Sequence, residues 1–186
     1  MDETDAVLVE RARAGDKEAF GALVMRNHRR VHALAWRMTG NAALADDIAQ
    51  ATFLRAWERL DSLREAGAFR PWLCRLTVRA SLDHLRHLPA EAELAEGLAS
   101  PEPGPEPAAL ANEQAAMVRR AVLALPAQCR AALVLREYEG LSYREIAQAL
   151  DIPLGTVMSR LNYARLHLRE ALAHYLVERP ALLEGQ

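Results

Sequence analysis

The chain is poor in the residues that build sheets and disulfide frameworks. Aromatic residues make up 5% of its 186 residues, and only two residues are cysteine. Cys74 and Cys129 stand alone, so the chain has neither a C-x-x-C motif nor the cysteine density of a disulfide-stapled domain. Alanine (36) and leucine (29) dominate instead, and both favour helices over sheets. We therefore expect an all-α protein whose two cysteines are reduced and partly buried.

Long apolar runs are also missing. None approaches the ~20 residues that a membrane-spanning helix needs. The first five residues, Met1 to Asp5, are acidic and lack the basic and apolar segments of a signal peptide. We therefore expect a cytoplasmic protein.

The motifs of catalysis and cofactor binding are absent as well. No Walker phosphate loop, G-x-G-x-x-G or G-x-S-x-G pattern occurs. Two histidine pairs, His28 with His32 and His84 with His87, have a spacing that lets a helix present both rings to a metal. Neither pair has a third ligand nearby in sequence or the glutamate of an H-E-x-x-H motif. We expect surface histidines, no metal, no cofactor and no enzymatic activity.

Positive charge is not in excess either, since 23 basic residues face 25 acidic ones. The distribution is uneven. Residues 1–87 carry a net charge of +2, residues 88–114 a net charge of -6, and residues 115–186 a net charge of +2. A polyanionic partner must therefore be considered segment by segment.

The centre of the acidic segment divides the chain. Four of the seven residues from Pro101 to Pro107 are proline, which removes amide donors and fixes φ, so this stretch favours an extended linker. We predict two small helical domains, 1–87 and 108–186, joined by a linker over residues 88–107. Glycine, proline and capping residues predict four helices in each domain, at about 4–14, 17–38, 41–60 and 71–87, and then at about 108–125, 127–138, 142–150 and from 156 onward.

The second predicted domain contains a short helix, a tight turn and a long helix. Ser142 and Glu145 have the spacing of a capping box, which opens the short helix. After a turn over residues 151–155, the next helix carries apolar residues at helical spacing, namely Val157, Leu161, Ala164, Leu168 and Leu172. This is the pattern of a helix-turn-helix, whose second helix enters the major groove of DNA. By pattern alone, an ordinary αα-hairpin is an equal alternative.

The residues of this motif favour the DNA-binding alternative. The runs GLSYREIA (140–147), GTVMSRL (155–161) and AR (164–165) closely resemble the promoter-reading domain of bacterial sigma factors, above all the extracytoplasmic-function group of the sigma-70 family. A second, independent resemblance lies in residues 45–57 (ADDIAQATFLRAW), which are similar to that family's polymerase-binding helix. The two motifs follow the family's order and, with their flanking segments, cover most of the chain.

The helix over residues 45–57 is expected to bind RNA polymerase. At roughly 100° per residue, four of its side chains form one stripe of mixed polar and apolar character that suits a protein contact, namely Asp47, Gln50, Leu54 and Trp57. In the family, the positions of Asp47 and Gln50 meet a coiled coil in the clamp of the polymerase largest subunit. The alternative is that Trp57 and Phe53 are ordinary core residues, which for Phe53 is the interpretation that we favour.

Residues 69–76 and 83–86 resemble the helix that opens and reads the -10 element of a promoter. The contact residues implied are Phe69, Arg70, Arg75, Arg79 and Arg86. The arginines are candidates for phosphate contacts, and the Phe69–Arg70 region for a pocket near a base displaced from the stack. Asp83 is close enough in sequence to pair with Arg79, and without the resemblance the alternative is a solvated, self-neutralising face.

The helix-turn-helix implies contacts with the -35 element. Arg160 and Arg165 flank the outer face of the second helix and suit phosphates, whereas the side chains between them could reach base edges. The full set of candidates is Arg144, Thr156, Ser159, Arg160, Asn162, Tyr163 and Arg165.

The chain departs from the family at some of these positions. Family members usually have asparagine where this chain has Arg79, and lysine or arginine is frequent where it has Met158 and Tyr163. The basic run that commonly follows the -10 helix is replaced by HLPAE (87–91). Because phosphate charge supplies much of nonspecific DNA affinity, we predict that the second domain alone binds DNA weakly and depends on polymerase for avidity.

The resemblance therefore implies a sigma factor that binds core RNA polymerase and promoter DNA and directs initiation, with its acidic linker near the RNA exit path. It also implies an anti-sigma protein, for which we would look at Leu166 and at the apolar surface of the helices over 44–60 and 71–87. Any membrane contact would be made through that anti-sigma protein. Two other classes stay open: a stand-alone helix-turn-helix transcriptional regulator, and a helical adaptor without promoter activity.

Overall fold

The computed structural model describes residues 3–87 and 106–178, with side chains for 3–87 and 113–173. All regular structure in these ranges is helical, as the composition predicts. The predicted linker over 88–107 lies outside these ranges except for its last two residues, which open α5. The exact domain boundaries therefore stay a prediction, and the helices are grouped below into a first unit (α1 to α4) and a second unit (α5 to α8).

The first unit consists of four α-helices and two single-turn 3-10 helices. Their bounds are α1 (Asp5–Arg13), α2 (Lys17–Thr39), α3 (Ala42–Glu58), η1 (Leu60–Ser62), η2 (Ala66–Ala68) and α4 (Phe69–His87). Side-chain caps set the starts of the helices. The Asp16 carboxylate accepts from two amides at the start of α2, both at 3.0 Å, and Asn41 accepts from Leu44 N at 3.0 Å at the start of α3. Gly40 ends α2 with φ +73°, a conformation that glycine adopts without strain.

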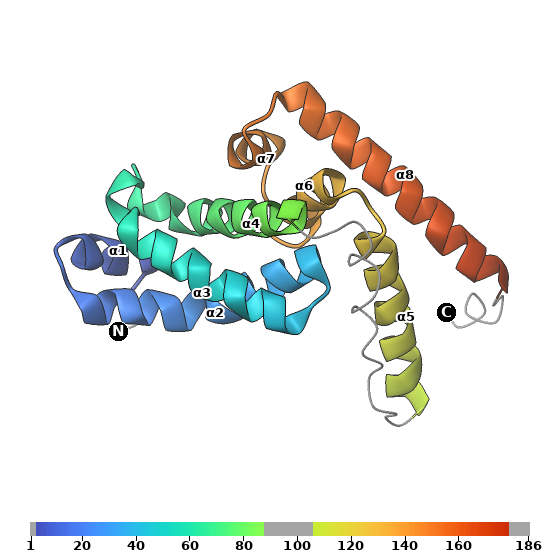
Figure 1. Cartoon of the computed structure of the whole chain (residues 1–186), viewed down its shortest axis with the longest axis horizontal. Helices are drawn as coiled ribbons and strands as arrows, with labels where there is room; N and C mark the ends of the chain where they lie inside the picture. The colour runs from blue at the N-terminus through green and yellow to red at the C-terminus, as the bar shows by residue number, and fades with distance from the viewer. Residues whose placement is uncertain (1–2, 88–105, 179–186) are drawn as a thin grey trace.

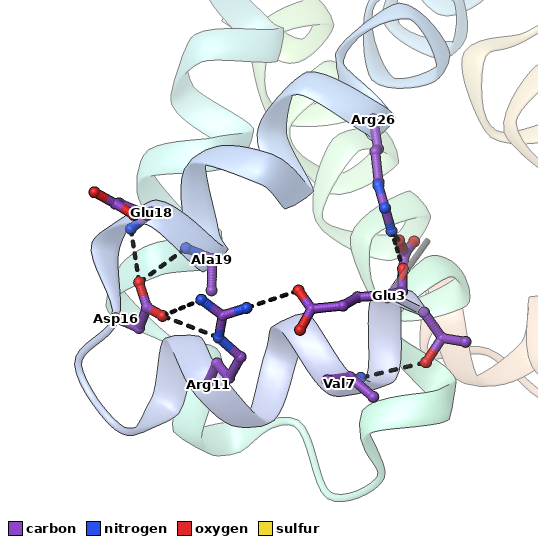
Figure 2. A network of polar contacts seen from close by, with 9 residues as sticks. Glu3, Val7, Arg11, Asp16, Glu18, Ala19 and Arg26 are labelled. Carbon is purple, nitrogen blue, oxygen red and sulfur yellow. Dashed lines mark hydrogen bonds and ion pairs between the residues drawn. The ribbon is translucent and has the colours of Figure 1, made fainter. Parts of the chain in front are cut away.

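Ion pairs and a hydrogen bond connect the N-terminal helix α1 and the residues before it to α2 and its cap. Figure 2 shows Arg11 between two carboxylates, with Nη1 2.7 Å from Glu3 and Nη2 2.7 Å from Asp16. The amide of Ala19 and then Arg11 hold the pKa of the Asp16 carboxyl below its usual value. Arg26 of α2 donates to the Glu3 carbonyl oxygen, so the chain before α1 is also attached to α2.

The second unit has the predicted helix order, with bounds α5 (Glu106–Leu123), α6 (Ala127–Glu137), α7 (Tyr143–Leu150) and α8 (Leu154–Glu178). The predicted capping box is confirmed, because Ser142 N donates to Glu145 Oε2 at 2.7 Å and Glu145 N donates to Ser142 Oγ at 3.3 Å. Asp151 ends α7 in the left-handed conformation, with φ 56°. The turn to α8 therefore completes a helix-turn-helix.

The two units share part of their hydrophobic core. One cluster lies within the first unit and includes Leu23, Phe69 and Leu73. A second and larger cluster joins side chains of α2 and α4 to side chains of every helix of the second unit. Figure 1 shows the corresponding arrangement, with α6 and α7 lying against α4 and α5 descending beside the end of α2.

Candidate functional site

All four residues of the predicted stripe on α3 are exposed. Leu54 is 61% and Trp57 39% exposed, and Asp47 and Gln50 also face solvent. Phe53 is 7% exposed and belongs to the core, which confirms the interpretation that we favoured for it. The Trp57 ring lies edge-on to Phe20 of α2, with centroids 4.8 Å apart.

This stripe borders an open groove between α2 and α3, of about 490 Å³. It is lined by Phe20, Val24, His28, Asp46, Asp47, Gln50, Phe53, Leu54 and Trp57. The floor is apolar and aromatic, while two carboxylates and an amide stand on the α3 side. Such a surface suits a helical partner that presents apolar side chains flanked by cations.

At the start of α4, the predicted contact residue Phe69 does not face solvent. Phe69 is 1% exposed and packs against Trp72, with ring centroids 5.9 Å apart. In this conformation its ring is not available to DNA, and it fixes the first turn of α4, from which the Arg70 side chain projects. The sequence pattern alone could not distinguish these two roles.

The four arginines of α4 have unequal surroundings. Arg70 Nη2 donates to the Glu139 carbonyl oxygen at 3.3 Å, and Arg79 Nε donates to the Ala149 carbonyl oxygen at 3.3 Å, both in the second unit. Arg75 is half-buried, and its Nε has no hydrogen-bond acceptor among the described residues. The fourth, Arg86, is exposed and pairs with Asp83 at 3.6 Å. The expected pairing of Asp83 with Arg79 is therefore wrong, because Arg79 turns to a carbonyl of α7 instead.

The helix-turn-helix presents its predicted faces as expected. Val157, Leu161 and Ala164 of α8 are completely buried, so the predicted core stripe is confirmed at these three positions. The opposite face is open, with exposed Ser159, Asn162, Tyr163 and Leu166, while Arg144 of α7 is also exposed and Thr156 is half-buried.

The two arginines that flank this face are held by neighbouring polar groups. Arg160 Nη1 donates to Gln128 Oε1 at 3.0 Å. Arg165 donates to Glu137 Oε1 at 3.0 Å and to Tyr143 Oη at 3.4 Å, and these bonds, that with Glu137 first, raise the pKa of its guanidinium. Such contacts position the guanidinium groups at the edge of the recognition face, where a DNA backbone passes in helix-turn-helix complexes.

The histidines fit the predicted surface role. His28, His84 and His87 are exposed, and His32 is half-buried with Nε2 3.2 Å from Asp46. In the part of the chain that the structure describes, no group of three or more His, Cys, Asp or Glu side chains is placed to hold a metal ion. Within residues 3–87 and 106–178, none of the helices combines the length and apolar character of a membrane span.

Sequence reasoning missed the polar groups that join the two units. Glu139 and Arg130 are 7% and 5% exposed, and both bond to the first unit. Neither belongs to a motif. The only signal was a charged residue, Arg130, next to the apolar run over residues 131–135, which indicates a satisfied buried charge without identifying its partner.

The second unit is therefore a helix-turn-helix with an open outer face, and the first unit is a helical unit with an open groove between α2 and α3. Family models support this class in detail, since Sigma-70 region 2 matches residues 23–88 and Sigma-70 region 4 matches residues 115–168. The chain is 39% identical to RNA polymerase sigma-H factor of Pseudomonas aeruginosa, over 95% of this chain and 97% of that protein. It is also 39% identical to ECF RNA polymerase sigma-E factor of Escherichia coli, over 87% and 91% of the two chains. The chain thus belongs to the extracytoplasmic-function group of the sigma-70 family, and it is a sigma factor for RNA polymerase, not an enzyme.

Solved structures show the same fold. The structure of CnrH in complex with the cytosolic domain of CnrY is similar with a TM-score of 0.68, at 26% identity, over 92% of this chain and 99% of that one. The sigma factor RpoE of Bartonella quintana, solved with the anti-sigma factor NepR, has a TM-score of 0.66 at 23% identity, over 83% and 96% of the chains.

Proposed function

We propose that the chain binds core RNA polymerase through the groove between α2 and α3. The observation that carries this proposal is the exposure of the α3 stripe, because Leu54 and Trp57 would be expected in a core if they served only the fold. The resemblance gives Asp47 and Gln50 a coiled coil of the largest subunit as their partner. A coiled-coil helix fits a groove with an apolar floor and a carboxylate edge.

We further propose that α4 contacts the -10 element and that α7 and α8 contact the -35 element. Arg86 and Arg144 are exposed cations on these helices, and Ser159, Asn162 and Tyr163 form the face that would read base edges. The face on α7 and α8 has few cations of its own. Tight binding to a promoter would therefore require that the chain is bound to polymerase. Such a protein acts where polymerase and promoter DNA are, and we propose the cytoplasm as its location.

An anti-sigma protein is the further partner that we propose. The support is the family resemblance together with the similar CnrH chain, which was solved bound to the cytosolic domain of another protein. Leu166, which is 48% exposed on α8, stays a candidate contact. The apolar face of α4 is a weaker candidate for contact with an anti-sigma protein, because the second unit covers that face in this structure.

Run-off transcription with purified core polymerase, with and without the chain, tests the proposed function. Transcripts from a specific promoter that form only when the chain is added support it. Unchanged output with tight DNA binding by the chain alone would indicate a stand-alone regulator, and neither activity would indicate an adaptor. A variant of the groove, Leu54→Asp, should abolish the gain in transcripts if the groove is the polymerase contact.

A further inference from the structure

The outer face of the first three turns of α8 carries apolar, hydroxyl and amide groups. Met158 is 44% and Tyr163 42% exposed, and Ser159 and Asn162 also face solvent. Because Leu161 of the same turns is completely buried, the packing of the unit fixes which side of the helix faces outward. The groups that this part of α8 offers to a major groove are therefore a thioether, a phenol, a hydroxyl and an amide.

The arginines of α8 lie beside this face or beyond it. Arg160 Nη1 donates to Gln128 Oε1 at 3.0 Å, and Arg165 Nη2 donates to Glu137 Oε1 at 3.0 Å. A guanidinium bonded in this way keeps donors for a phosphate oxygen, but a bidentate contact with a guanine would require it to turn away from its partner. Arg169 is exposed but lies 15 residues after the first residue of α8, about 22 Å along its axis. The arginines of α8 are therefore placed for phosphates.

The two polar side chains between the arginines favour adenine over guanine. Ser159 Oγ donates to the Thr156 carbonyl oxygen at 3.0 Å, so its proton is used inside the helix and its lone pairs can only accept from a base. Asn162 has no hydrogen-bond partner among the described residues, so its amide offers a donor and an acceptor together. That pair of groups matches N7 and the N6 amino group of adenine.

Met158 is the neighbour of Asn162 on the surface of the helix. The two residues are four positions apart, which places their Cβ atoms roughly 5–6 Å apart. Successive base pairs are ~3.4 Å apart, so the two side chains reach base pairs that are adjacent or separated by one. The thioether of Met158 has no hydrogen-bond donor. The group in a major groove that suits such a side chain is the C5 methyl of thymine.

The last of the exposed side chains, Tyr163, borders the end of the base-reading region. Its ring lies against His167, with centroids 4.2 Å apart, and His167 Nδ1 is 3.8 Å from Glu170 Oε2. The exposed Glu170 carboxylate repels phosphates, so it disfavours a DNA backbone at this point of α8. Base contacts are therefore confined to the residues before it, as in helix-turn-helix complexes, where the first turns of the second helix meet the base edges.

We propose that α8 reads an A·T-rich element, with Met158 against the C5 methyl group of a thymine and Asn162 paired with an adenine one or two base pairs away. Arg160 and Arg165 contact the phosphates at the edges of this element. This specificity rests on the contact between α8 and the -35 element proposed above, and it assigns a base to each of two residues. Met158 stands where lysine or arginine is frequent in the family, and a cation at this position would favour guanine instead.

Transcription by core polymerase together with the full chain tests this specificity. Templates whose upstream region is random in sequence select the promoter, and the element farther from the start site is the one assigned to α8. Replacing its thymine by deoxyuridine removes only the methyl group and should lower run-off transcription about fourfold. Met158→Ala should transcribe both templates equally. Met158→Arg should shift the preferred pair at this position from A·T to G·C.

The adenine contact has its own base analogue. Replacing the adenine by 7-deazaadenine removes N7, and transcription by the unaltered chain should fall about tenfold, as loss of a bidentate base contact would. Asn162→Ala should be insensitive to this replacement. The matched control for the methionine variants is Met25→Ala, because Met25 is 81% exposed on α2 and does not line the groove. It should keep the full effect of the thymine methyl group.

Three results would overturn the proposed specificity. The selected element might depend on guanine and on Arg160 or Arg165, it might contain no thymine with a methyl effect, or the methyl effect might persist in Met158→Ala. In each of these cases promoter-specific transcripts still form, so the proposed function stands while the base assignment fails. If no promoter-specific transcript forms with any template, the proposed function itself is wrong, and the base assignment falls with it.

Discussion

The α3 stripe and the arginine-bearing face of α4 belong to the same helical unit but differ in their contacts with the second unit. On α3, two large apolar side chains face solvent beside an open groove. On α4, two of the four predicted DNA-binding arginines bond to the second unit, and an entire apolar row lies under α6 and α7. The second unit therefore contacts the helix proposed to meet the -10 element and leaves the proposed polymerase surface free.

The largest effect is expected at the open surface. Leu54→Asp places a charge in the apolar lining of the groove and should weaken binding of core polymerase by roughly 30-fold or more, the range of an interface hot spot. Fluorescence anisotropy of the labelled chain against core polymerase measures this. Val7→Asp is the control, because Val7 is an exposed apolar residue (46%) on α1 and outside the groove. Equal loss in both variants would place the polymerase contact elsewhere.

A second prediction concerns the close approach of the two units at Gly40. Gly40→Ala should destabilise the chain by about 2 kcal/mol, because it combines a positive φ with a clash against Leu123. Gly140→Ala is the matched control, since its φ of +70° is nearly the same and nothing lies within 4 Å of its Cβ. Urea denaturation should show the smaller loss for the control.

The double variant Gly40→Ala with Leu123→Ala isolates the contact between the units. Shortening Leu123 removes the atoms that the new methyl group meets, so the double variant should recover part of the stability lost by Gly40→Ala. If the losses instead add, the two residues do not touch in solution and the units are not packed as described.

The third prediction contrasts two arginines of α4. Arg79→Ala and Arg86→Ala should each lower run-off transcription by about fivefold, as loss of a phosphate contact would. Of these two, only Arg79 bonds to the second unit, so only Arg79→Ala should also lower the free energy of unfolding, measured by urea denaturation. Equal destabilisation by both variants would contradict the unequal contacts of the two arginines.

The smallest effect is expected at the capping box of the helix-turn-helix. Its hydrogen bonds, led by the one with the Ser142 side chain, hold the pKa of the Glu145 carboxyl below its ordinary value. A lowered pKa in the folded state means that the ionised carboxylate stabilises the fold above that value and that this contribution is lost as the pH falls through the folded-state pKa. Glu145→Gln should therefore reduce the change in the free energy of unfolding between pH 6 and pH 3 by less than about 1 kcal/mol, because the carboxylate is exposed. An unchanged pH profile would exclude a role for the cap.

Local structure could be predicted well from the sequence. The capping box, the core stripe of α8 and the buried position of Phe53 all depend on residues close together in the chain, and all three are present. The helix starts were also predictable because Asp16 and Asn41 cap them directly. These features follow from helical periodicity and from unpaired amides at helix ends.

The contact between the units could not be predicted in the same way. A helix such as α4, with apolar residues on two faces, must bury both, but its sequence does not say whether another domain or another protein covers the second face. Glu139 contacts Cys74, 65 positions away, and Arg30, 109 positions away. Arg130 bonds to Met38, 92 positions away. No spacing rule connects such pairs. The partner of Asp83 was mispredicted for a related reason, since Arg79 found an acceptor outside its own helix.

The most direct measurement is the distance between a probe on α1 and a probe on α8, at the exposed positions Glu10 and Arg169, in the free chain and in its complex with core polymerase and promoter DNA. Pulsed electron paramagnetic resonance measures this distance. Spin labels on unnatural amino acids at these two positions keep both native cysteines in place. A single narrow distance distribution in the free chain that changes in the complex is the predicted result. A broad distribution in the free chain would contradict the packing of the two units.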